Sequence, residues 1–405
     1  MPALAIRAFT ATTALGRGCQ AQLDALRERR GGLRRNDFGE ADHDGGGRLE
    51  TWIGRVDGLE TAPLPAAFAD WECRNNRLAW LALQHDELLG AVRAARDRHG
   101  ADRVAIVLGT STASIGATEE AYARLVDNGQ GGQAFPADLQ RSQVHTPHSL
   151  GGFVQQATGL HGPCVTVATA CSSSAKVFAQ AARLLQAGVV DAALVGGVDT
   201  LCASVLYGFN ALGLVSTTPC RPFDAGRDGL SLGEAGGFAL LERAGRDDTL
   251  QLRGYGESSD AHHMSTPHPE GLGARLAMGD ALARAGIDAA AVGYLNLHGT
   301  ATPANDAVEA RAVAALFPAS LHASSSKGWT GHTLGAAGIV ESVFALLALQ
   351  HGLLSGTLNS RHADPACGPQ VKFDNADRDV QYAMNNSFGF GGNNCSLVFG
   401  KAASL

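Results

Sequence analysis

The sequence predicts an α/β protein built from two similar halves. Each half contains a helix rich in small residues, expected at residues 171–188 and again at residues 332–352. Each half also closes with a strand-like segment after a glycine-rich turn, at residues 236–242 and 393–400. Because the same elements recur in the same order, we interpret the chain as an internal duplication.

The two small-residue helices are expected to lie inside the protein. Gly335, Ala336, Ala337 and Gly338 open the second of them. Small residues on successive faces allow close backbone approach, as in helices that are buried on all sides. The two helices can therefore pack together at the centre of the molecule. An open, doubly wound single sheet is the alternative, because alternating strands and helices do not separate the two architectures.

The length of 405 residues is sufficient for two domains of about 200 residues each. We place them at residues 1–245 and 246–405, with the crossover between the halves at residues 243–248. Residues 36–47 and 127–140 are rich in Asp, Gly or Gln and are predicted to be surface loops.

Composition narrows the class of protein. Hydrophobic residues make up 45% of the chain and charged residues 18%, which is typical of a globular protein. No apolar run approaches the ~20 residues of a membrane span and the N-terminus lacks a secretory signal, so we predict a cytoplasmic protein with no membrane partner. The net charge of −7 argues against binding to nucleic acid. The eight cysteines form no CxxC pair and no metal-like spacing, so we expect reduced cysteines and no metal.

Cys171 is the first candidate catalytic residue. The β-branched run VTVATA ends at Cys171, and the helix-compatible segment SSSAK follows it. This order puts the sulfur at the first turn of a helix, where unpaired N–H groups and the helix dipole favour the nucleophilic thiolate. A lone cysteine also fits an inert core position.

Two histidine motifs support the catalytic interpretation. His298 ends an apolar strand in YLNLHGTATP, at the carboxyl end where α/β proteins place their sites. His332 follows a strand and a loop in SSSKGWTGHTLGAAG. Lys327 lies in the same loop and is one of only four lysines in an arginine-rich chain, which suggests a role that arginine cannot fill.

Together these residues resemble those of β-ketoacyl-acyl carrier protein synthases of the I/II type, within the thiolase-like superfamily. The resemblance runs essentially end to end. It includes CRPFD at 220–224, RDG at 227–229, GEAGG at 233–237 and the glycine-rich loop NSFGFGGNN at 386–394. A cysteine elbow, two histidine motifs and this loop in family order form a specific combination.

The resemblance implies a thiolase-like, five-layered α-β-α-β-α fold made from the two halves. It also implies an acyltransferase that performs a decarboxylative Claisen condensation. An acyl thioester held on Cys171 would react with malonyl-acyl carrier protein to give β-ketoacyl-acyl carrier protein, in fatty acid or in polyene- or polyketide-like biosynthesis. No cofactor is implied, since the substrate carrier protein brings the phosphopantetheine arm.

The resemblance also assigns the catalytic roles. Cys171, His298, Lys327 and His332 would be the catalytic residues. The two histidines would stabilise the enolate as neutral Nε2–H donors, and Lys327 would orient them. The oxyanion hole would consist of the backbone N–H groups of Cys171 and Phe390.

Further residues receive supporting roles, each with a structural alternative. Glu341 would pair with Lys327, or form a simple structural ion pair. Phe388 would gate the acyl pocket together with Phe390, or pack in the core. Thr300 and Thr302 would bind pantetheine, or cap the turn. Thr112 would lie at the base of the acyl pocket, while Asp306 and Glu309 are expected to be structural.

The expected partners follow from the resemblance and from one segment in which the sequence differs from the family. An acyl carrier protein is the expected partner, but residues 60–72 contain no Lys or Arg where the family often has a basic docking helix. The resemblance also implies a dimer with residues 164–169 near its two-fold axis, since this apolar segment would be an exposed edge in a monomer. It is either a homodimer or a heterodimer with a synthase-like sister subunit, and the missing basic residues favour the heterodimer.

Two other functions remain as alternatives. The chain could be a non-catalytic, chain-length-type partner, although such subunits lose the cysteine. A thiolase is disfavoured because Asn393 and Asn394 stand where its second cysteine is expected, and Cys395 alternates into a strand.

Overall fold

Ten strands form one hydrogen-bonded path within residues 1–39, 48–245 and 248–402, which the computed structural model describes. The order is β14-β13-β17-β18-β12-β1-β11-β9-β5-β8, and β2 (Gly16–Arg17) pairs with β1 (Leu4–Thr13) beside it. In this part of the chain, two residue pairs, Leu4–Leu252 and Ala5–Gln251, join β1 to β12 (Leu250–Ser259). Since the neighbouring strands share many more pairs, we treat the path as two sheets that touch at one corner.

The two sheets have the same topology. The first contains, in chain order, β1, β5 (Val104–Gly109), β8 (Cys164–Val167), β9 (Ala192–Asp199) and β11 (Ala235–Arg243). The second contains β12, β13 (Val292–Asn296), β14 (His322–Ser324), β17 (Tyr382–Gly389) and β18 (Asn393–Lys401). In each sheet the spatial order is third, second, fourth, fifth, first. The first two neighbouring pairs are parallel and the last two antiparallel.

This shared order confirms the predicted duplication. The predicted strands at 236–242 and 393–400 fall in β11 and β18, the last strand of each half. The division of the chain at residue 245 stays a prediction, and residues 246–247 lie outside the described residues.

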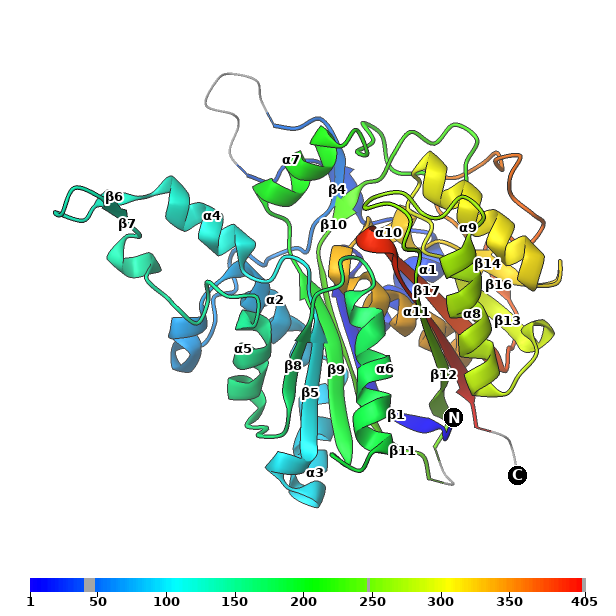
Figure 1. Cartoon of the computed structure of the whole chain (residues 1–405), viewed down its shortest axis with the longest axis horizontal. Helices are drawn as coiled ribbons and strands as arrows, with labels where there is room; N and C mark the ends of the chain where they lie inside the picture. The colour runs from blue at the N-terminus through cyan, green and yellow to red at the C-terminus, as the bar shows by residue number, and fades with distance from the viewer. Residues whose placement is uncertain (40–47, 246–247, 403–405) are drawn as a thin grey trace.

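Two helices form the layer between the sheets (Figure 1). They are α6 (Ser173–Gln186) and α11 (Ala337–His351), which contact each other and strands of both sheets. A Cβ atom on Gly338 would lie 2.3 Å from the backbone nitrogen of Ala175, so the close approach of these helices requires glycine there. The predicted central helix pair is confirmed, and a single doubly wound sheet is excluded.

Helices cover the outer face of each sheet and complete five layers. The first sheet is covered by α2 (Arg74–Leu83), α3 (Leu88–His99) and α5 (Ser149–Thr158). The second is covered by α8 (Leu272–Ala285) and α9 (Pro303–Leu316). This arrangement is the five-layered α-β-α-β-α architecture that the sequence predicts.

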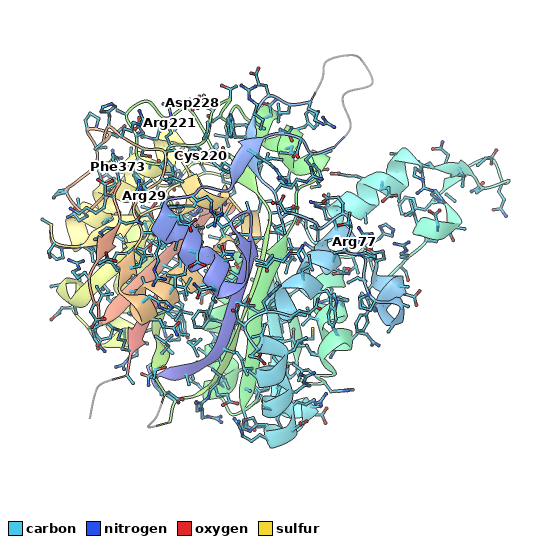
Figure 2. The ribbon with its side chains drawn as sticks, turned by 180° about the vertical axis from the view of Figure 1, so that it is seen from behind. Arg29, Arg77, Cys220, Arg221, Asp228 and Phe373 are labelled. Atoms are coloured by element: carbon cyan, nitrogen blue, oxygen red, sulfur yellow. The ribbon has the colours of Figure 1, made fainter. Side chains whose placement is uncertain are left out.

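The halves are also joined across the back of the molecule. α1 (Gly18–Glu28) packs against β1 and α11, and Arg29 follows it. The Arg29 guanidinium donates a hydrogen bond to the carbonyl oxygen of Phe373 at 3.0 Å, and the two residues lie together in Figure 2. This contact ties the first helix to the second half.

An arm projects from the first half (Figure 1). It contains α4 (Ile115–Ala123) and the short strands β6 (Val126–Asp127) and β7 (Gln133–Ala134). The loop predicted at 127–140 is therefore at the surface, as expected, but it includes part of a small hairpin. Of the loop predicted at 36–47, residues 40–47 lie outside the described residues.

One described helical stretch is long and apolar enough to cross a membrane, Leu334–His351, and 89% of it is buried inside the protein. It consists of a 3₁₀ turn (Leu334–Ala336) and α11, so its hydrophobicity is that of a core helix.

Candidate active site

The candidate site lies where the carboxyl ends of strands from both sheets meet. Cys171 lies between β8 and α6, and His298 follows β13. Lys327 and His332 lie between β14 and α11, and Phe390 follows β17. The equivalent connections of the two halves thus face one another.

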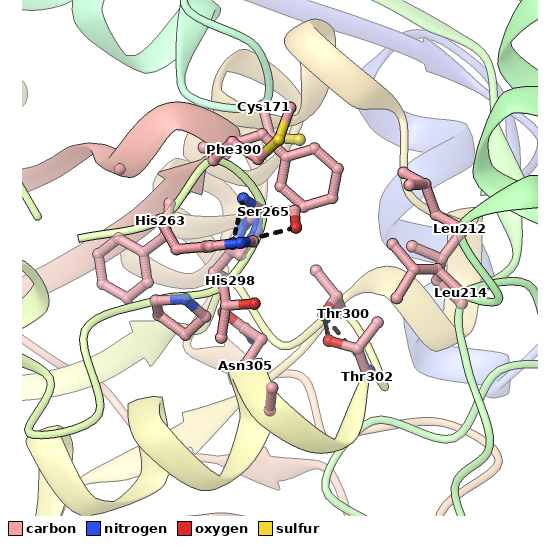
Figure 3. Close-up of a pocket in the computed structure, with 18 of the residues that line it drawn as sticks. Cys171, Leu212, Leu214, His263, Ser265, His298, Thr300, Thr302, Asn305 and Phe390 are labelled. Atoms are coloured by element: carbon pink, nitrogen blue, oxygen red, sulfur yellow. Dashed lines mark hydrogen bonds between the residues drawn. The ribbon is translucent and has the colours of Figure 1, made fainter. Parts of the chain in front are cut away.

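These connections surround a cavity of about 370 Å³, seen in close-up in Figure 3. Its lining includes Cys171, His298, His332, Phe388 and Phe390 together with Thr300 and Thr302. The sequence-predicted nucleophile, both histidines and both threonines are therefore neighbours in space.

Cys171 is held in a sharp turn between strand and helix. Ala170 has a φ of 51°, which is unusual for a non-glycine residue, and α6 begins two residues after the cysteine, at Ser173. The sulfur therefore lies just before the helix rather than in its first turn. The side chain is only 5% exposed.

Burial of Cys171 opposes the thiolate that the sequence predicts. Burial raises the pKa of the Cys171 thiol to about 11, although the Lys327 charge and a hydrogen bond from the Phe390 backbone N–H both lower it. Desolvation thus outweighs these two contributions and favours the thiol over the thiolate. The Phe390 N–H nevertheless faces the sulfur, as the oxyanion-hole prediction requires.

His332 contacts the nucleophile directly. Its Nε2 lies 3.0 Å from Sγ of Cys171, while its Nδ1 accepts a hydrogen bond from the backbone N–H of Leu334 at 3.3 Å. Since Nδ1 accepts, the proton of the neutral ring must reside on Nε2. Burial and the Lys327 charge hold the pKa of His332 well below its usual value, so the ring is a neutral donor.

His298 also carries its ring proton on Nε2, but for a different reason. Nζ of Lys327 lies 3.4 Å from its Nδ1, so the ammonium group occupies that side and leaves Nε2 to carry the proton. Burial and the charge of Lys327 lower the pKa of His298 well below its usual value. The rings of His298 and His332 are 5.5 Å apart and nearly perpendicular.

Lys327 is fixed from the other side by a buried carboxylate. Its Nζ donates to Oε1 of Glu341 at 2.6 Å and also to the carbonyl oxygen of His298. Burial raises the pKa of Glu341, and the Lys327 charge opposes this shift. The predicted contact between Lys327 and Glu341 is present.

The glycine-rich loop covers the nucleophile. A Cβ atom on Gly389 would lie 2.8 Å from the carbonyl oxygen of Thr169, so only glycine allows the loop to approach the cysteine turn this closely. The ring of Phe390 stacks on Phe209 at 5.7 Å, whereas Phe388 lies 5.8 Å from the ring of His298. Each phenylalanine thus pairs with a different partner rather than with the other.

Three predicted site residues, Lys327, Glu341 and Thr112, are absent from the cavity lining, and of these only Thr112 has no contact with the histidines or with Lys327 among the described residues. Its hydroxyl donates to Oδ1 of Asp199 at 2.7 Å and accepts from the backbone N–H of Thr200. In the described chain it is thus a buried structural contact, and the predicted role at the base of an acyl pocket stays untested.

Some residues at the site had no predicted role in catalysis or binding. Glu309 and Asp306, predicted to be structural, hold the loop after β13: Glu309 accepts the N–H groups of His298 and Gly299, each at 2.8 Å. The segment at 260–267 also lines the cavity, and the Met264 carbonyl oxygen accepts the Gly391 N–H at 2.7 Å. The adjacent histidines at 262 and 263 were the only sequence signal in that segment.

Comparison with known proteins identifies the family. Residues 5–246 match the N-terminal domain of beta-ketoacyl synthases, and residues 250–361 match the C-terminal domain. The chain is 40% identical over 269 residues to the mitochondrial 3-oxoacyl-[acyl-carrier-protein] synthase of Arabidopsis thaliana, covering 61% of this chain and 58% of that protein. It is 35% identical over 319 residues to 3-oxoacyl-[acyl-carrier-protein] synthase 2 of Staphylococcus aureus, covering 74% and 76%.

A solved structure extends the similarity over the whole chain. It is the ketosynthase ApeO in complex with its chain length factor ApeC from Xenorhabdus doucetiae. One chain of it has a TM-score of 0.87 and 34% identity, covering 99% of this chain and 98% of that chain. As the sequence predicted, the chain belongs to the β-ketoacyl synthase family of acyltransferases and has its thiolase-like fold.

Proposed function

We propose that the protein condenses an acyl group held on Cys171 with a malonyl group, both delivered as acyl carrier protein thioesters. The observation that carries this proposal is the 3.0 Å contact between Nε2 of His332 and Sγ of Cys171, with His298 opening into the same cavity. A thiol nucleophile beside two neutral imidazole donors matches the needs of decarboxylative condensation, in which no proton has to be abstracted from carbon.

The first step transfers the acyl group. The Cys171 thiolate attacks the acyl thioester carbonyl, and the backbone N–H groups of Cys171 and Phe390 stabilise the tetrahedral oxyanion. The intermediate then breaks its bond to the carrier sulfur, which leaves as a thiol with the proton lost by Cys171. The cysteine then carries the acyl chain.

The second step makes the carbon–carbon bond. The malonyl carboxylate leaves as carbon dioxide, and its bonding electrons form an enolate whose oxygen accepts hydrogen bonds from Nε2–H of His298 and His332. The enolate carbon attacks the acyl carbonyl on Cys171, and the C–S bond breaks as the β-ketoacyl carrier protein forms. The sulfur departs as a thiolate and takes up a proton from water, which restores the thiol for another cycle.

The remaining residues position these groups. Lys327, anchored on Glu341, keeps Nδ1 of His298 unprotonated. Thr300 and Thr302, whose hydroxyl oxygens lie 2.8 Å apart on the cavity wall, are placed to bind the amides of the pantetheine arm. Phe390 and Phe388 control access to the sulfur. No metal or cofactor beyond the carrier's own arm enters this scheme.

The two alternative functions fit the described residues less well. A non-catalytic partner subunit does not need Cys171, whereas here the cysteine contacts a histidine. A thiolase needs a second cysteine in the site, but Cys395 is fully buried in β18, opposite Ser387 and Glu257, and does not line the described cavity.

The carrier and a second synthase-like subunit are the proposed partners, in the cytoplasm. The arginines that follow the predicted docking region are already paired: Arg74 binds Glu234 at 2.6 Å, and Arg77, visible in Figure 2, binds Glu72. They are thus not free to dock an acidic carrier. A sister subunit that supplies the missing basic surface, as a chain length factor accompanies ApeO, would fill this need.

The test is a mass-spectrometric acyl-transfer assay with a panel of acyl carrier proteins. We expect a covalent acyl adduct on Cys171 and release of carbon dioxide when malonyl-carrier protein is added. An adduct on another cysteine, or acylation without decarboxylation under any condition, would overturn the proposal.

A further inference from the structure

Asp199 is a buried carboxyl group that the proposed reaction does not use. It ends β9, its side chain is fully buried, and it accepts hydrogen bonds from six donor groups. These are the hydroxyls of Thr110, Ser111 and Thr112 and the backbone N–H groups of Ser111, Thr112 and Ala336, at 2.6–3.1 Å.

These contacts connect the two halves of the protein. Five of the six donors belong to the loop that follows β5 in the first half, while Ala336 stands at the start of α11 in the second. Ser111 adds a second link, because its hydroxyl donates to Oδ2 of Asp199 at 2.9 Å and accepts the Gly335 N–H at 3.1 Å. Asp199 thus holds two successive N–H groups, directly at Ala336 and through Ser111 at Gly335.

Leu334, the residue just before these anchors, has a strained backbone. Its φ is 58°, in the left-handed region that non-glycine residues rarely adopt. In this conformation its N–H donates to Nδ1 of His332. Such strain persists only where the surrounding contacts impose it. The anchored Gly335 and Ala336 provide those contacts on the C-terminal side.

We propose that Asp199 is a positioning residue that sets the tautomer of His332. It fixes the start of α11, the fixed turn keeps the Leu334 N–H on Nδ1, and the ring proton therefore stays on Nε2, facing Cys171. Only the predicted effect on the reaction rate rests on the proposed condensing function. The tautomer itself is a property of the free protein.

The direct test observes that tautomer without any substrate. Protein labelled with nitrogen-15 histidine is compared with Asp199→Asn, and the His332 signals are assigned by their loss in His332→Ala. We expect a pure Nε2–H tautomer in the wild type and a population with Nδ1 protonated in Asp199→Asn. An unchanged tautomer in a folded Asp199→Asn protein overturns the proposal, whatever reaction the enzyme catalyses.

The kinetic test asks whether Asp199 acts through His332. Asp199→Asn is expected to slow malonyl decarboxylation about 10- to 100-fold, the scale of a misplaced catalytic group. In a His332→Ala background the same change should have little further effect, since neighbours that act together are not additive. Equal losses in both backgrounds would mark Asp199 as merely structural.

Ser111→Ala provides the variant that keeps the test decisive if Asp199→Asn does not fold. It leaves the buried carboxylate in place but removes the link to Gly335, and we expect a smaller shift in the same tautomer signal. Thr110→Val is the matched control, because it also removes one hydroxyl donor of Asp199 without touching α11. A shift in Thr110→Val as large as in Ser111→Ala would contradict the proposed path.

Discussion

Nζ of Lys327 lies 2.6 Å from Oε1 of Glu341, and neither side chain is more than 3% exposed to solvent. An ion pair so deeply buried gains Coulomb energy but loses the hydration of both charges. Oε2 of Glu341 has no hydrogen-bond partner among the described residues. The pair is thus better explained by its effect on His298 than by a contribution to stability.

Single and double variants of Lys327 and Glu341 should separate the effect of the ion pair on stability from its effect on catalysis. Lys327→Met or Glu341→Leu alone leaves one buried charge uncompensated, and each should lower the free energy of unfolding by about 3–5 kcal/mol. The double variant should recover much of that loss while decarboxylation remains impaired. Denaturant melts and a carbon dioxide release assay measure the two quantities. A double variant as unstable as the worse single variant would contradict this account.

Cys171→Ala should abolish acyl-enzyme formation and condensation, because no other described cysteine lines the cavity. Cys171→Gln should still decarboxylate malonyl-carrier protein, since its amide occupies the oxyanion-hole side as an acylated cysteine would and leaves both histidines intact. Mass spectrometry of the adduct and carbon dioxide release distinguish the variants. An acyl adduct that survives in Cys171→Ala would mean that the nucleophile is wrongly assigned.

His298→Ala and His332→Ala should reduce decarboxylation by about 10²-fold or more, the usual effect of losing an oxyanion donor. Self-acylation should remain at least partly intact, because it depends on the cysteine and the backbone N–H groups. The two half-reactions are measured separately with acyl- and malonyl-carrier proteins. Equal loss of both steps in both variants would refute this division of roles.

The pH dependence of Cys171 alkylation tests the effect of burial on the thiol. Burial raises the pKa of the thiol to about 11. The thiolate fraction, and with it the alkylation rate, should therefore grow about tenfold per pH unit from about pH 6 to pH 9 without reaching a plateau. Lys327→Ala removes a charge that lowers this pKa, so alkylation at fixed pH should slow. Cys171→Ala reports background labelling of the other cysteines. A plateau near neutral pH would instead support the helix-stabilised thiolate.

The protein should form a dimer through the edge of its first sheet. β8 is at the end of the strand path and its four residues are only partly buried, so the edge is open to pairing with another chain. Light scattering of the protein alone, and after co-expression with its native gene neighbours, measures this. A monomer at micromolar concentration would contradict the dimer, and a fully active homodimer with no gain from a sister subunit would contradict the heterodimer.

The sequence was sufficient to predict the duplicated architecture and the grouping of Cys171, His298, Lys327 and His332. Each follows a strand, and parallel strands bring their carboxyl ends to one edge of a sheet. The surroundings of Thr112 were not predictable, because they depend on Asp199, a residue 87 positions further along the chain. The burial of the Cys171 thiol was not predictable for a similar reason, since desolvation depends on packing that local helix geometry does not reveal.

The repeated strand order distributes the catalytic residues over two halves of the same topology. In one half the connection between the third strand and the central helix presents a thiol, and in the other the same connection presents Lys327 and His332. Neither half contains a complete site. A substitution of the cysteine therefore removes the nucleophile from one half without altering the connection that presents Lys327 and His332 in the other.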